Sequence, residues 1–126
     1  MRIIATILIF LICHLGYGQS AKRMSGNLLE LPKITAHDNV IIYTGFTVSY
    51  NTSTLIPNWV AYELTSTEVD GQFPRKGQFG QDLSFRGRQA MREDYSNSGW
   101  DKGHMCPAGD LKWSEKTMYE SFYLTN

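Results

Sequence analysis

The sequence has 126 residues, enough for one domain of ordinary size. Apolar residues make up 42% of it and aromatic residues 13%, a composition that suits a packed core and excludes an intrinsically disordered chain. Twelve basic and twelve acidic residues give a formal net charge of zero, which excludes a surface that is basic all over.

The first 18 residues are typical of a secretory signal peptide. Arg2 precedes an apolar run over residues 3–15, and Gly18 is a small residue suited to cleavage before Gln19. The run is too short to cross a bilayer comfortably, and an uncleaved N-terminal anchor is the alternative. The signal therefore predicts a secreted or periplasmic protein, with no stable membrane association after cleavage.

Strands are predicted early in the remaining chain. Residues 19–39 are polar and mixed, and we interpret them as a loose leader to a domain over 40–126. The segments VIIY and FTVSY, which flank Thr44-Gly45, are rich in β-branched and aromatic residues and predict a hairpin over 40–50. A single strand with a glycine bulge is the alternative. A further strand is predicted over 59–65.

Residues 66–98 show little periodicity and predict a long surface loop with short elements. Loops of this length are usually functional or disordered. The part over 75–92 holds five basic residues against one acid, Asp82, so it could contact phosphates while the whole chain stays neutral. A solvated loop, balanced by neighbouring acids, is the alternative.

A helix and a short strand are predicted near the C-terminus. Leu111, Met118 and Phe122 recur at helical spacing, which indicates a helix from about Asp110 to Tyr119. Asp110 is a possible N-cap of this helix. The final FYLTN predicts a short strand.

The densest group of reactive side chains lies in GWDKGHMCPAGD, residues 99–110. His104 could be a general base that deprotonates water while Lys102 holds an anionic substrate. His104 and Cys106 could instead be half of a zinc site, or Cys106 could be a nucleophile with His104 as its base. A histidine that only hydrogen-bonds in a turn is the structural interpretation. The residues alone leave these alternatives open.

Residues 94–126 closely resemble the DNA/RNA non-specific endonuclease family, the relatives of Serratia nuclease and endonuclease G. DKGHMCPAGD corresponds to the family's D-R-G-H signature and FYLTN to its asparagine after YLS or YLT, and residues 50–65 are similar to its upstream strand region. The resemblance implies an α+β fold of the ββα-metal (His-Me finger) type with an antiparallel sheet. It also implies Mg²⁺-dependent hydrolysis of phosphodiester bonds in DNA and RNA.

The resemblance also implies roles for individual residues. His104 matches the general base, Asn126 the residue whose side-chain oxygen binds Mg²⁺ or another divalent cation, and Asp101 the signature aspartate that supports the histidine or the turn. Lys102 stands where the family usually has arginine, so it would hold phosphate less rigidly. An upstream basic residue often helps to bind phosphate, and the candidates in order are Arg75, Arg86 and Arg88.

Family members continue beyond the position of Asn126 into the helix that completes the ββα motif. We therefore expect this sequence to be a fragment truncated before that helix. Residues 19–126 alone are expected to show little or no plasmid nicking with Mg²⁺. The alternative function is an inactive nucleic-acid-binding remnant of such a nuclease.

Overall fold

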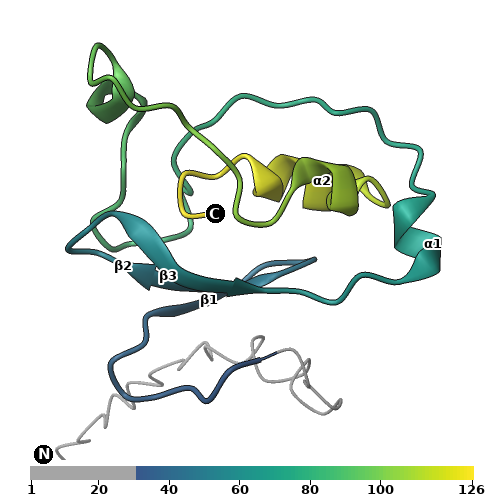
Figure 1. The fold of residues 1–126 in the computed structure, drawn as a ribbon, viewed down its shortest axis with the longest axis horizontal. Helices are drawn as coiled ribbons and strands as arrows, with labels where there is room; N and C mark the ends of the chain where they lie inside the picture. Colours follow the sequence, from purple (N-terminus) through teal and green to yellow (C-terminus); the bar gives the residue numbers. More distant parts are fainter. Residues whose placement is uncertain (1–30) are drawn as a thin grey trace, which may run out of the picture.

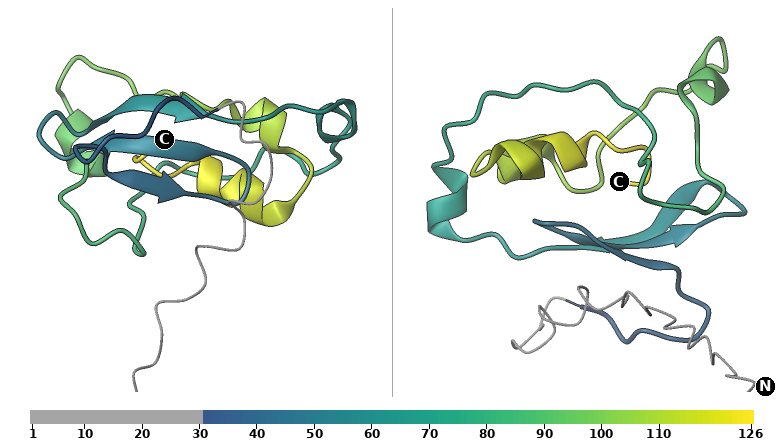
Figure 2. Two further views of the ribbon diagram at one scale, coloured as in Figure 1. Left: turned by 90° about the horizontal axis from the view of Figure 1, so that it is seen from below. Right: turned by 180° about the vertical axis from the view of Figure 1, so that it is seen from behind.

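The structure, a computed structural model, describes residues 31–126, so the predicted signal peptide lies outside the described residues. Three strands form one antiparallel sheet in the order β1–β2–β3. Helix α2 lies over one face of this sheet, and residues 31–39 run along the other (Figures 1 and 2). The strands are β1 at Val40–Ile42, β2 at Thr47–Asn51 and β3 at Ile56–Ala61.

The predicted hairpin is confirmed. Ile42 pairs with Thr47, and the Tyr43 N–H donates to the Phe46 carbonyl at 2.8 Å, so Thr44 and Gly45 form the turn. The third strand exists, but it begins at Ile56 and ends at Ala61 instead of covering 59–65. The central strand β2 is the most buried of the three, as its mixed β-branched and aromatic sequence favours.

The hairpin turn connects the sheet to helix α2. The Thr44 N–H and hydroxyl donate to the Glu120 carboxylate at 2.7 and 3.1 Å. Gly45 approaches Leu111 so closely that an added Cβ would lie 2.6 Å from its Cδ2. A residue with a side chain at position 45 would therefore separate the two layers.

The C-terminal prediction needs two corrections. The single helix from Asp110 to Tyr119 is wrong, because the 3-10 helix η3 (Ala108–Leu111) ends before α2 (Glu115–Ser121) begins. Ser114 is the N-cap of α2, since its Oγ accepts from the Thr117 N–H at 3.1 Å. The predicted strand over 122–126 is also wrong, because it contributes only one parallel bridge, between Tyr123 and Gly80.

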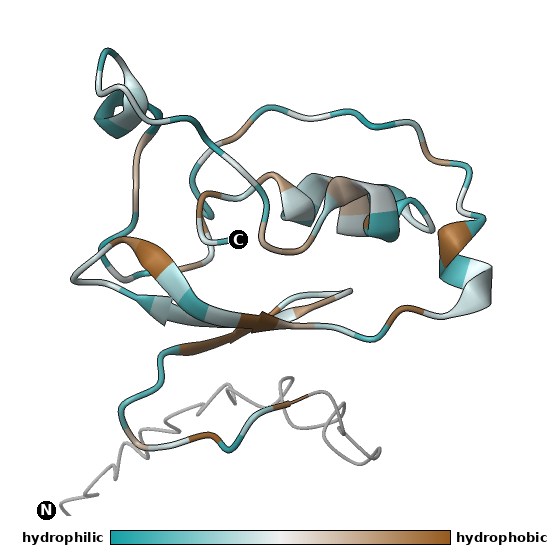
Figure 3. Ribbon diagram, viewed as in Figure 1, coloured by the Kyte–Doolittle hydropathy of each residue, from teal (hydrophilic) through white to brown (hydrophobic). Residues whose placement is uncertain are grey.

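The predicted long loop with short elements is confirmed between β3 and η3. It contains α1 (Ser66–Val69) and the 3-10 helix η2 (Arg92–Tyr95), and it arches around α2 (Figure 1). Most of its length is hydrophilic (Figure 3). It is nevertheless fixed from within, because Asp82 is fully buried and accepts from the Tyr43 hydroxyl at 2.7 Å.

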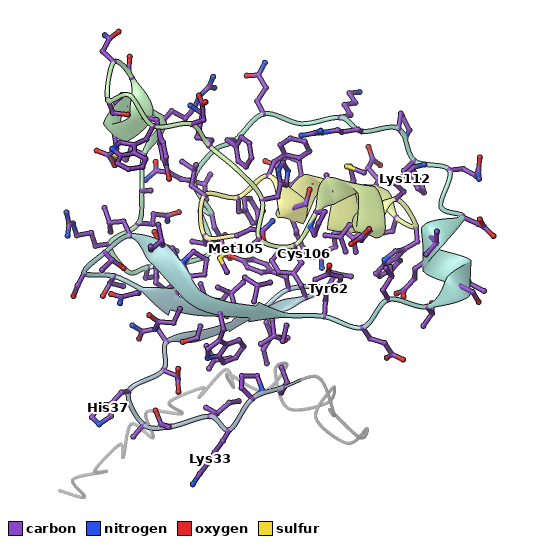
Figure 4. The ribbon with its side chains drawn as sticks, viewed as in Figure 1. Lys33, His37, Tyr62, Met105, Cys106 and Lys112 are labelled. Atoms are coloured by element: carbon purple, nitrogen blue, oxygen red, sulfur yellow. The ribbon has the colours of Figure 1, made fainter. Side chains whose placement is uncertain are left out.

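Two apolar clusters form the core of this α+β fold. The first joins the sheet to the segment after His104 and contains Tyr43, Phe46, Val48, Tyr50, Cys106 and Leu111. Figure 4 shows Cys106 and Tyr62 between the sheet and α2. The second cluster lies on the helix side and contains Ala108, Met118 and Phe122 with the half-buried Phe79. Within residues 31–126, no helix has the length and apolar character needed to span a bilayer.

Candidate active site

His104 is half-buried between two phenylalanine rings. Its ring centroid lies 4.5 Å from that of Phe79 and 4.8 Å from that of Phe122, with the Phe122 ring nearly perpendicular. The two phenylalanines come from distant segments. The bridge between Gly80 and Tyr123 brings these segments together. This aromatic pocket fixes the plane of the imidazole by packing.

The imidazole has an unused polar atom. His104 Nε2 is buried and has no hydrogen-bond partner among the described residues. Burial lowers the pKa of His104, and the positive charge of Arg75 lowers it further. The ring is therefore neutral near pH 7 and can accept a proton.

Arg75 is the predicted phosphate ligand that the fold brings nearest to this histidine. Its guanidinium carbon lies 5.7 Å from the centroid of the Phe122 ring, the same ring that contacts His104. Arg86 and Arg88 are exposed, and Arg88 donates weakly to the Thr52 carbonyl at 3.5 Å. The structure shows no contact between either of these two residues and His104.

Asp101 and Lys102 precede the histidine on an exposed stretch. The Lys102 ammonium nitrogen lies 5.1 Å from the centroid of the Tyr95 ring. No hydrogen bond joins Asp101 to His104 in the structure. The aspartate is thus solvent-accessible, and the histidine is oriented by aromatic packing.

Asn126 fastens the chain just after the histidine. It is 5% exposed, and its Oδ1 accepts from the Cys106 N–H at 2.8 Å. Its Nδ2 donates to the carbonyls of Cys106 at 3.0 Å and Ser121 at 2.7 Å. These three bonds hold the chain two residues beyond His104 against the end of α2.

Cys106 does not have the surroundings of a reactive thiol. Its side chain is fully buried, and burial, with a smaller effect of Asp110, raises its pKa to about 12. The thiolate needed for nucleophilic attack is therefore scarce near neutral pH. No group of three or more His, Cys, Asp or Glu residues that could hold a metal occurs in the described part of the chain. Packing thus accounts for Cys106.

The sequence interpretation missed the two phenylalanines and Glu120. Phe79 stands in an aperiodic loop, and Phe122 carries only a helical-spacing signal. Contacts between segments so distant in the chain leave no periodic pattern. The capping contact of Glu120 with Thr44 is likewise visible only after folding.

Three proteins named as nucleases are similar to this chain in sequence. It is 42% identical over 111 residues to the mitochondrial nuclease EXOG of Danio rerio, covering 86% of this chain and 32% of that protein. It is 40% identical over 86 residues to human mitochondrial nuclease EXOG, covering 67% and 23%. It is 32% identical over 92 residues to mitochondrial endonuclease G of Caenorhabditis elegans, covering 70% and 30%. The chain thus spans about a third or less of the length of these relatives.

A solved structure shares the fold. It is a crystal structure of the complex of EndoG with EndoGI that addresses how EndoG is inhibited. The TM-score is 0.70 at 29% sequence identity, with 81% of this chain and 44% of that chain covered.

The relatives contradict the predicted secreted or periplasmic location. EXOG of Danio rerio, mouse and human and a nuclease of Saccharomyces cerevisiae are all named as mitochondrial. The predicted location rested on an apolar run that lies outside the described residues, and it is wrong.

The match to a family extends over most of the chain. Residues 25–126 match the family described as DNA/RNA non-specific endonuclease, so the match begins within the predicted leader. The chain belongs to the DNA/RNA non-specific endonuclease family.

Proposed function

We propose that this protein hydrolyses phosphodiester bonds in DNA and RNA, with His104 as the general base and with Mg²⁺ or another divalent cation as cofactor. The observation that carries the proposal is the buried His104 Nε2, which has no hydrogen-bond partner in the described structure. An unpaired buried nitrogen costs free energy, and a water molecule that enters the site would relieve this cost by hydrogen-bonding to Nε2, from where the imidazole could accept its proton.

The proposed reaction is attack of water on phosphorus. His104 takes a proton from the water as the new P–O bond forms, and the bond from phosphorus to the leaving oxygen breaks. Proton transfer of this kind contributes roughly 10²–10⁴-fold to the rate. Arg75 would contact the phosphate from the Phe122 side and Lys102 from the exposed stretch. Contacts of this type do not depend on base identity, which fits cutting without sequence preference.

A divalent cation would stabilise the negative charge that develops on the phosphate and the leaving oxygen. The predicted ligand is Asn126, but its Oδ1 already accepts a backbone N–H and the residue is 5% exposed. These contacts favour a role in positioning the loop over a role in binding the ion. No step of the proposed mechanism therefore depends on an ion held by Asn126.

The general-base role is tested with His104→Ala in the natural gene product, assayed on supercoiled plasmid and on single-stranded RNA with Mg²⁺. We expect turnover to fall by roughly 10²–10⁴-fold. His37→Ala is the matched control, because His37 is exposed on the leader, away from α2 (Figure 4). Unchanged turnover in His104→Ala would exclude this role. Oligonucleotide binding without any cutting by the unmodified protein would favour the nucleic-acid-binding remnant.

The general-base role also predicts how nuclease activity depends on pH. A general base works only when deprotonated, and burial, followed by Arg75, lowers the pKa of His104. The value of kcat/KM should therefore rise with pH to a plateau, with its inflection below the ordinary histidine value of about 6.5. Arg75→Gln should move the inflection upward, because it removes a nearby positive charge. An inflection above the ordinary value in the unmodified protein would contradict the assignment.

A further inference from the structure

An open pocket with positively charged walls lies beside the His104 segment. It measures about 420 Å³ and is lined by Arg92, Glu93, Ser96 and Lys102. Arg92 and Glu93 belong to η2, whereas Lys102 lies two residues before His104. Two residues span at most about 7 Å, so the Lys102 wall of the pocket adjoins the candidate active site.

Neither cation of this pocket forms an ion pair with a described residue. The only ion pair among residues 31–126 joins Lys116 to Glu120, so no carboxylate lies within 4.0 Å of the charged nitrogens of Arg92 or Lys102. Arg92 Nη1 donates to the side-chain oxygen of Gln78 at 3.3 Å. This bond uses one of the five guanidinium N–H groups and steadies the rest. The contact of Lys102 with the Tyr95 ring steadies the ammonium group in the same way.

We propose that Arg92 binds a second phosphodiester of the nucleic acid strand, next to the one that His104 would attack, with Lys102 lying between the two phosphates. This inference rests on the proposed function. Ser96 adds a hydroxyl, which is a common donor to phosphate oxygens. The bound strand is thereby held at two successive points, which fixes its register without reading its bases.

Glu93 indicates which kind of phosphate the pocket suits. Two cations and one carboxylate leave a formal charge of one positive unit on the pocket wall. An internal phosphodiester carries one negative charge, whereas a terminal phosphate carries about −1.5 to −2 near neutral pH. The net charge of the wall therefore matches that of an internal phosphodiester. A terminal phosphate would need a further positive charge, which this wall lacks.

The proposal is tested by the affinity for a short fluorescein-labelled single-stranded DNA, followed by anisotropy over a salt series with EDTA present to prevent cutting. Arg92→Ala should weaken binding and make the slope of log K against log salt less negative by about 0.7. Glu93→Gln should tighten binding, a change of opposite sign that loss of structure would not produce. Lys33→Ala is the charge-matched control on the leader (Figure 4) and should leave the slope unchanged.

The results separate this inference from the proposed function. An unchanged slope in Arg92→Ala, with weaker binding in Lys102→Ala, would overturn the second phosphate site and leave the nuclease proposal standing. Preference for a 5′-phosphorylated DNA that depends on Arg92 would overturn the assignment to an internal phosphodiester. Failure of the unmodified protein to bind any DNA would count against the proposed function itself.

Discussion

The surroundings of His104 are made by side chains that lie far from it in the sequence. His104 itself was selected through the resemblance to the endonuclease family, since the residues of 99–110 alone left its role open. Its two ring partners were not, since Phe79 and Phe122 look like ordinary core residues until the chain is folded. Burial is the largest cause of the lowered His104 pKa, so the direction of this shift could not be predicted from neighbouring residues in the sequence.

The role of Asn126 can be decided by measuring its effect on Mg²⁺ dependence. Asn126→Ala removes partners from the Cys106 N–H and from two carbonyls, which should lower the free energy of unfolding by about 1–3 kcal/mol. If the side chain positions the loop, maximal turnover of the natural protein should fall while the half-saturating Mg²⁺ concentration stays constant. Asn39→Ala, the same substitution at an exposed residue, should change neither the maximal turnover nor the half-saturating Mg²⁺ concentration.

A marked rise in the half-saturating Mg²⁺ concentration of Asn126→Ala, with maximal turnover preserved, would contradict the positioning role. That result would support Asn126 as a ligand of the ion.

At the level of secondary structure, local signals predicted the hairpin well. Its two strands carry β-branched and aromatic residues on either side of a Thr-Gly turn, so the pattern and the turn agree. The helix boundaries failed because Asp110 and Ser114 are both acceptable N-caps. Tertiary contacts decide between them, since the Asp110 carboxylate is bonded to the Tyr62 hydroxyl at 2.9 Å. The bridge of Tyr123 was missed because Gly80 stands in a loop without periodicity.

The packing of the long loop against the C-terminal segment predicts that Gly77 cannot be replaced without loss of activity and stability. Gly77 packs against the ring of Phe122, and an added Cβ would overlap that ring. Gly77→Ala should displace the ring from His104, lowering nuclease turnover and costing about 1–3 kcal/mol in unfolding free energy. Kinetics and urea denaturation measure these two effects.

Gly109→Ala is the matched control, because nothing lies within 4 Å of the Cβ that it would add. Equal effects of the two substitutions on turnover would show that the contact of Gly77 with Phe122 is unimportant for the site.

Across the whole molecule, one buried polar network joins three distant segments. The Tyr43 hydroxyl donates to Asp82 at 2.7 Å and lies 2.6 Å from the Thr125 hydroxyl, so it connects the sheet, the long loop and the C-terminal segment. No sequence pattern indicated this network, because its members are separated by 39 and 82 positions. The long loop was predicted correctly as a loop, but its anchoring was not.

This network predicts that removing the hydroxyl oxygen of Tyr43 alone lowers the stability of the fold. Tyr43→Phe leaves Asp82 and Thr125 with one partner fewer in a buried position. The free energy of unfolding should therefore fall by about 1–3 kcal/mol, measured by urea denaturation. Tyr119→Phe removes the same atom from a residue that is 63% exposed and should have almost no effect. Similar losses from the two substitutions would rule out a special contribution of the network.

The distance along the chain between His104 and Asn126 affects when the imidazole acquires its surroundings. During translation, His104 leaves the ribosome before Phe122, and Asn126 follows later still. Until then the nascent polypeptide has neither the second aromatic wall nor the amide that fastens Cys106. Under the proposed function, a nascent polypeptide still attached to its messenger RNA would carry an unorganised imidazole and would not cut that template while this region is being made.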